Sequence, residues 1–272
     1  MLQLPFFLPF FLFSLIFFNQ STSATNPFVY SGCSQVRFTP GTPYDLNVNS
    51  LFSSLVNSSY VSNFINFKIS ASGSTVFGLF QCEGDLNNAI CKDCVATAVS
   101  QLKAICPQGI GGVIQLEGCF VKYDNTSFFG VEDKTEVSKV CGPSIGYNSD
   151  ALNRRDAELA FLTASNGQYF RGSGSGSVQG VAQCVQDLSV SQCQDCLIEA
   201  SGRLRAECET STWADIFLGK CYIRYLDRER HSQKNNEDVD ETLAITIGVI
   251  TGIILLIVCL SSLGKAFKKG GK

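Results

Sequence analysis

The hydrophobic residues occur in two ways, as uninterrupted runs near both ends of the chain and as periodic positions between them. Residues 1–18 form an apolar run rich in Phe and Leu, and residues 243–263 contain no charged residue. A helix over 243–263 would be about 31 Å long, enough to cross a hydrocarbon core. We therefore predict a transmembrane helix at 243–263.

The flanks of the two runs predict the topology. Residues 19–24 are small and polar, so we interpret 1–24 as a secretory signal peptide cleaved after Ala24. Four lysines follow the predicted transmembrane helix and four acidic residues precede it. By the positive-inside rule this predicts a type I membrane protein, with a stalk at 229–242 and a cytosolic tail at 264–272.

The periodic segments between the runs predict an α+β fold. Apolar residues recur at the three-to-four spacing of amphipathic helices over 95–105 and 197–206, and further helices are expected around 51–56 and 157–161. The segments 114–120 and 216–222 have the alternation of strands. We expect helices packed on an antiparallel sheet, twice.

Cysteine spacing makes the duplication explicit. Successive separations of 9, 3, 12 and 13 positions occur twice, and each set has a distant leading cysteine. The first set is Cys33, Cys82, Cys91, Cys94, Cys106 and Cys119, and the second is Cys141, Cys184, Cys193, Cys196, Cys208 and Cys221. We predict two domains, at 25–134 and 135–228. Cys259 remains, inside the predicted transmembrane helix.

The residues around the cysteines repeat as well. Val76–Cys82 matches Val178–Cys184, and Cys-x-Asp-Cys occurs in both copies. Asp93 and Asp195, inside those motifs, suit the start of a helix through capping and the helix dipole.

Composition narrows the function classes. Thirteen cysteines against one histidine and one methionine indicate an oxidising compartment, where structural disulfides are far more probable than zinc or redox Cys-x2-Cys sites. Removing the four tail lysines leaves 17 basic against 24 acidic residues, which disfavours binding to nucleic acid. Six cysteines allow 15 pairings, so spacing alone does not give the disulfides.

The Cys-x8-Cys-x2-Cys core, the Val-x-Gly-Leu-x-Gln-Cys lead-in and the run Tyr123–Gly130 resemble the ginkbilobin-like (salt-stress/antifungal) domain of land plants. Two such domains with one transmembrane helix and no kinase look like the plasmodesmata-located protein family. The resemblance implies disulfides between the first and fifth, second and third, and fourth and sixth cysteines. These pairs are Cys33–Cys106, Cys82–Cys91, Cys94–Cys119, Cys141–Cys208, Cys184–Cys193 and Cys196–Cys221.

The resemblance also locates a sugar site to examine. The mannose-binding antifungal member of the family is thought to use Asn, Arg and Glu at three set positions. This chain has Ser34, Val113 and Asp124 there in the first repeat, and Gly142, Asp215 and Leu226 in the second. We expect this lectin site to be lost.

Other candidate chemistry is weak. The single histidine, His231, lies in the polar stalk, which argues against a Ser-His-Asp or Cys-His centre. Glu117 with Asp124 suggests a glycosidase pair, but the second repeat has Gly219 and Leu226 there, and solvated carboxylates are favoured. The run Gly172–Gly176 lacks the Lys of a phosphate loop and is interpreted as a flexible loop. We expect no catalytic residues, metal or cofactor.

Modification and association sites follow from short motifs. Asn57 and Asn125 begin Asn-x-Ser sequences and are candidate glycosylation sites. Gly248 and Gly252 have the spacing that allows two membrane helices to approach closely, although lipid-facing glycines are about equally compatible. Cys259 is a candidate for acylation, with an inert apolar side chain slightly preferred.

Two functional hypotheses result. The first, implied by the resemblance, is a non-enzymatic plasma-membrane protein at plasmodesmata that regulates cell-to-cell trafficking and callose deposition. Its expected partners are the membrane, copies of itself or related membrane proteins, callose-synthesis machinery and receptor-like kinases. The alternative is a surface lectin or antifungal defence protein that binds cell-wall polysaccharide.

Overall fold

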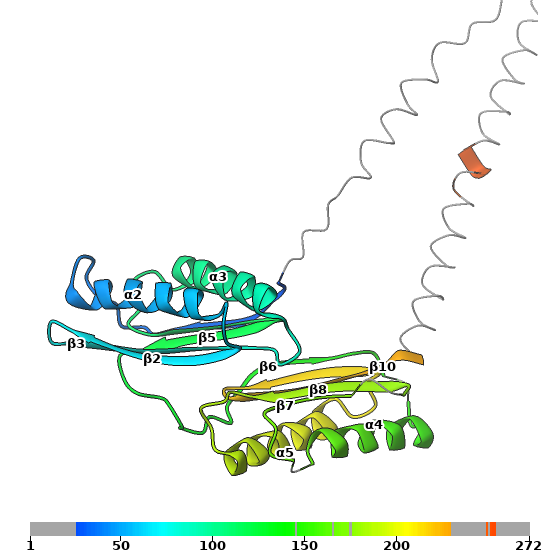
Figure 1. Cartoon of the computed structure of the whole chain (residues 1–272). Helices are drawn as coiled ribbons and strands as arrows, with labels where there is room; N and C mark the ends of the chain where they lie inside the picture. The colour runs from blue at the N-terminus through cyan, green and yellow to red at the C-terminus, as the bar shows by residue number, and fades with distance from the viewer. Residues whose placement is uncertain are drawn as a thin grey trace, which may run out of the picture. The chain divides into compact units, whose positions relative to one another are not determined.

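A computed structural model describes residues 26–229, except 145, 165, 174 and 175, together with residue 249 and residues 251–253. Within these residues the chain forms two compact units, with the boundary between Ser127 and Phe128 (Figure 1). No helix in this part of the chain has both the length and the apolar character needed to span a membrane. Most of the predicted transmembrane segment 243–263 lies outside the described residues.

The first unit is a five-stranded antiparallel sheet with two helices on one face (Figure 1). The strand order is β1-β4-β5-β3-β2. The elements in chain order are β1 (Phe28–Cys33), α2 (Pro43–Ser58), β2 (Phe64–Ala71), β3 (Ser74–Cys82), α3 (Asn88–Ile105), β4 (Gly112–Leu116) and β5 (Cys119–Asp124).

The second unit repeats this arrangement with the strand order β6-β9-β10-β8-β7. Its elements are β6 (Glu136–Cys141), α4 (Ser149–Leu162), β7 (Phe170–Gly172), β8 (Val178–Cys184), α5 (Val190–Glu207), β9 (Trp213–Leu218) and β10 (Cys221–Asp227). The predicted α+β fold, with two tandem domains that each contain internal disulfides, is confirmed.

The core of each unit lies between the helices and the sheet. In the first unit Leu51 and Leu55 of α2, Leu102 of α3 and Ile114 of β4 are fully buried. A Cβ on Gly78 of β3 would lie 2.5 Å from Leu51 Cδ2, and one on Gly180 of β8 would lie 2.5 Å from Leu162 Cδ1. The glycine of the repeated Val-x-Gly motif is therefore needed because a helix packs directly on the strand at that point.

Six disulfides join the elements, in the pairing that the family resemblance implies. Cys91 and Cys94, one turn apart on α3, bond to Cys82 at the end of β3 and Cys119 at the start of β5. Cys82 and Cys119 are directly opposite each other in the sheet. The Cys-x2-Cys motif thus fixes one helical turn to a cross-strand pair, and the second unit repeats the arrangement with Cys184 opposite Cys221.

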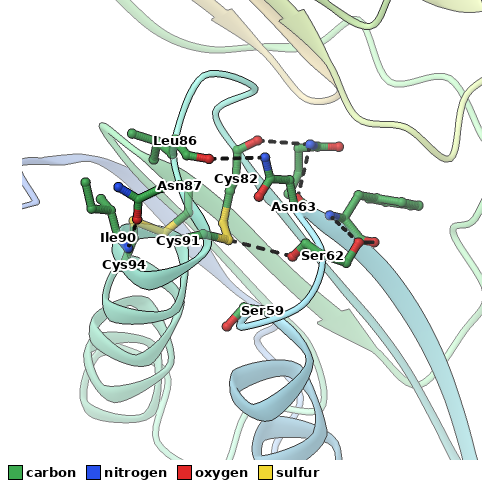
Figure 2. The surroundings of a disulfide bond; sticks show 12 residues. Ser59, Ser62, Asn63, Cys82, Leu86, Asn87, Ile90, Cys91 and Cys94 are labelled. Atoms are coloured by element: carbon green, nitrogen blue, oxygen red, sulfur yellow. Dashed lines mark hydrogen bonds between the residues drawn. A yellow bond between two sulfur atoms is a disulfide. The ribbon is translucent and has the colours of Figure 1, made fainter.

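The helix starts differ from the sequence prediction. Asn87 is the N-cap of α3, and its side-chain oxygen accepts hydrogen bonds from Ala89 N at 3.1 Å and Ile90 N at 3.0 Å (Figure 2). Ser189 caps α5 and forms a capping box with Gln192. Asp93 and Asp195 lie inside the helices, so the prediction that they mark the helix starts was wrong. Both helices begin before the Cys-x2-Cys motif.

The boundary between the units also differs from the expected one, because the residues after Ser127 belong to the second unit. Phe128 O accepts a hydrogen bond from Lys220 Nζ at 3.2 Å, and Gly130 N donates to Asp187 Oδ2 at 3.1 Å. Lys220 and Asp187 form an ion pair with side chains that are only 1% and 2% exposed. Residues 128–134, assigned to the first domain from the sequence, therefore pack on the second.

The capping assignment predicts unequal effects of two neighbouring substitutions. Asn87→Ala should lower the free energy of unfolding by about 1 kcal/mol, because two backbone N–H groups lose their acceptor. Asp93→Asn should change it by less than about 0.5 kcal/mol, as expected for a surface substitution away from a cap. Denaturant unfolding of both variants checks this, and a larger loss for Asp93→Asn would contradict the assignment.

Candidate functional site

The three positions of the family's sugar site meet at one end of the first sheet. Ser34 N donates to Gly111 O at 2.9 Å, and a Cβ on Gly111 would lie 2.5 Å from Asp124 Oδ2. Val113 lies in the adjoining strand β4. Asp124 Oδ1 accepts hydrogen bonds from the backbone N and the hydroxyl of Thr126. The fold brings the positions together, but no cationic or amide side chain occupies any of them.

In the second unit the corresponding place is filled. A Cβ on Gly142 would lie 2.5 Å from Trp213 Nε1, so the indole occupies the space beside this residue. Asp215 forms an ion pair with Arg224, with 3.2 Å between Arg224 Nε and Asp215 Oδ1. Leu226 offers no hydrogen-bonding group. Neither unit therefore holds the side chains that the mannose site requires.

A separate cleft of about 300 Å³ lies between α2 and the end of α3 in the first unit. Phe52 and Tyr123 pack edge to face with ring centroids 5.1 Å apart, and Lys103 Nζ lies 5.1 Å from the centre of the Phe52 ring. Lys103 also donates to Asn49 Oδ1 at 3.4 Å. Phe38 lines the opposite wall. This cleft was not predicted, because its residues are far apart in the sequence and no single motif brings them together.

In the second unit an arginine side chain lies beside the equivalent tyrosine. Tyr123 and Tyr225 are equivalent, since each donates its hydroxyl to a backbone carbonyl, of Gly109 and Ser211 respectively. Beside Tyr225, Arg155 is 8% exposed and donates to Glu209 O and Asp156 Oδ1. In the first unit the side chains around Tyr123 leave the cleft, which Val48 and Phe52 help to line.

The hydroxyls of Tyr123, which lines the cleft, and of Tyr44 stay protonated at physiological pH. Burial, followed by the nearby charge of Asp124, raises the pKa of Tyr123 to about 12. Burial is likewise the main cause that raises the pKa of Tyr44, whose hydroxyl donates to Ile110 O. The two hydroxyls therefore serve as hydrogen-bond donors to the backbone and not as bases.

The remaining predicted residues are distributed as follows. Glu117 precedes β5 and Asp124 is its last residue, so the structure does not bring the two carboxylates together. Asn57 and Asn125 are exposed, and their glycosylation stays a prediction. His231, Gly248 and Cys259 lie outside the described residues. A Cβ on Gly252 would meet no atom within 4 Å. Among the described residues no cluster of His, Cys, Asp and Glu could hold a metal ion.

Comparison with known proteins agrees with the duplicated fold. The family model for salt stress response/antifungal domains matches twice, over residues 32–126 and 139–228. The chain is 51% identical to plasmodesmata-located protein 6 of Arabidopsis thaliana, over 93% of each chain. It is 50% identical to plasmodesmata-located protein 7 of the same plant, over 93% of this chain and 87% of the relative. The chain belongs to the plasmodesmata-located protein family.

Solved structures of the family have the same architecture. The tandem DUF26 ectodomain of the Arabidopsis thaliana cysteine-rich receptor-like protein PDLP5 matches with a TM-score of 0.70 and 40% identity, over 74% of this chain and 99% of that one. The PDLP8 ectodomain matches with a TM-score of 0.71 and 40% identity, over 75% and 99%.

The buried tyrosines predict alkaline sensitivity. Because the folded-state pKa of Tyr123 lies above the ordinary value of 10.0, folding holds its proton, and this stabilisation is complete below pH 10.0 and is lost as the pH rises towards 12. The free energy of unfolding should therefore fall over this range. Denaturant unfolding at stepped pH measures the fall, which should be smaller in Tyr123→Phe; an equal fall in that variant would rule out Tyr123 as its source.

Proposed function

We propose that this protein is a receptor-like membrane protein of plasmodesmata that acts by binding and not by catalysis. The observation that carries the proposal is the 51% identity with plasmodesmata-located protein 6 over nearly the whole of both chains. This match extends beyond the two domains into both ends of the sequence. The predicted topology is type I, with the two domains outside the cell and a single membrane helix at 243–263.

The chemistry of the described sites supports a binding role. Tyr123 at the cleft is a protonated hydrogen-bond donor, and the acidic residues Glu117 and Asp124 do not meet. We propose that the protein restricts cell-to-cell movement and promotes callose deposition by recruiting callose-synthesis machinery or receptor-like kinases.

The wall-glycan hypothesis receives less support. The family's mannose positions carry Ser34, Val113 and Asp124 in one unit and Gly142, Asp215 and Leu226 in the other, without the Asn, Arg and Glu of the lectin. A surface that binds wall polysaccharide in another way would be compatible with the fold. A glycan array probed with the full-length protein in detergent tests this hypothesis.

Localisation tests the proposal. A fluorescent protein fused to the C-terminus should appear as puncta at cell junctions, and raised expression should slow the spread of a diffusible fluorescent protein between cells. A variant that ends at Glu229 should be secreted and inactive. A second variant carries an unrelated apolar helix in place of 243–263. It tests whether this segment only anchors the protein in the membrane or also makes specific contacts. Even labelling of the plasma membrane with unchanged intercellular diffusion would contradict the proposal.

A further inference from the structure

Strand β2 forms an edge of the first sheet that is long and regular. It pairs with β3 over Phe64–Ala71 without a register shift and contains no proline. The other sheet edges are interrupted or short. The pairings of β1 and β6 each contain a register shift, and β7 has only three residues. Regular edges of this length are the ones that accept another strand.

The outward-facing backbone groups of β2 can be identified. Asn63 O accepts from Cys82 N at 2.7 Å, and Ala71 pairs with Ser74 across a two-residue turn in which Ser72 and Gly73 have φ of 52° and 77°. Both observations place the odd-numbered residues in the hydrogen bonds to β3. The even-numbered residues therefore direct their N–H and C=O groups away from the sheet.

Three residues have these outward groups open. At Phe64 the hydroxyl of Ser62 accepts from the backbone N at 3.3 Å and donates to the carbonyl at 2.7 Å. Asn66, Lys68 and Ser70 have no such cap, and no residue in the described ranges hydrogen-bonds to their backbone groups. All three are exposed.

An apolar row runs along the same edge. Ile65, Phe67 and Ile69 pack against the core of the first unit but remain only half-buried. A strand added beside β2 would cover this row and also accept and donate the open hydrogen bonds. Main-chain bonding with burial of alternate side chains is the usual basis of strand addition.

We propose that two copies of this protein pair through β2, antiparallel and related by a twofold axis at Phe67. This register places Asn66 opposite Lys68 of the second copy, Ile65 opposite Ile69, and the two Phe67 rings beside each other. Phe64, whose backbone groups are capped by Ser62, falls opposite Ser70, so the outward backbone groups of Ser70 stay in water and the central bonds are made by Asn66 and Lys68. The register centred on Lys68 would set two ammonium groups opposite each other, which is unfavourable.

The second copy is the occupant because the strand is complementary to itself in this register. Its single charge, on Lys68, meets the amide of Asn66, and its three apolar residues meet one another. The pairing would join the two sheets into one continuous sheet and is of the isologous type found in twofold dimers. It concerns the extracellular domain and does not depend on where in the cell the protein is located.

Charge substitutions at Asn66 test the pairing. Asn66→Lys places lysines opposite each other at two symmetric positions, and should weaken self-association by roughly tenfold. Asn66→Glu creates two Glu–Lys pairs, and should strengthen self-association in a manner that high salt removes. The matched control is Ser53→Lys, which adds the same charge at an exposed position of α2 and should have no effect.

The measurement is resonance energy transfer between labelled full-length chains in lipid vesicles, as a function of protein density. All variants also carry Gly248→Leu and Gly252→Leu, so that association through the predicted membrane helix does not mask the effect. Hydrogen exchange at the amides of Asn66 and Lys68 should slow as density rises. The proposal is overturned if Asn66→Lys and Asn66→Glu associate equally, or if these amides gain protection only when another protein is added.

Discussion

Each unit depends on the attachment of one helical turn to two neighbouring strands. Cys91 and Cys94 lie on the same side of α3 because residues three apart in a helix are neighbours. Their partners, Cys82 and Cys119, face each other across β3 and β5. Two covalent links at one end of α3 fix both its position and its rotation over the sheet. A third disulfide, between Cys33 and Cys106, holds the other end of α3, where the cleft lies.

The helices and strands that were predicted from the sequence are those whose apolar positions are the ones buried in the core. The helices α3 and α5 and the central strands β4, β5, β9 and β10 carry repeated apolar positions, and all lie at the centre of a unit. The edge strand β2 was not identified individually, although Ser72–Gly73 is a turn signal, because its counterpart β7 in the second repeat has only three residues and the repeat therefore does not mark it. The helix starts were misplaced because the Asp inside Cys-x-Asp-Cys is a good capping residue, while the actual caps, Asn87 and Ser189, precede the motif. The cleft depends on tertiary contacts alone.

The two units keep one backbone but differ in how they fill space. Tyr123 lines a cleft in the first unit, whereas the largely buried Arg155 lies beside the equivalent Tyr225 in the second. Where the first unit has a small residue at Ser34, the second has Gly142 covered by Trp213. The second unit has a cleft elsewhere, of about 520 Å³, between α4 and the loop after β7. The two units therefore share a backbone but differ in where their surfaces are open.

For a chain that follows the predicted secretory route, the unit boundary has a consequence for the order of folding. All six disulfides lie within a unit, and the residues after Ser127 contribute to the second unit only. The first unit is thus complete in sequence before Cys141 has entered the secretory lumen. Its six cysteines can pair among themselves, with 15 possible arrangements instead of the far larger number that twelve would allow. Vectorial entry of the chain, N-terminal unit first, separates two oxidation problems in time and limits mispairing between repeats whose cysteine spacing is identical.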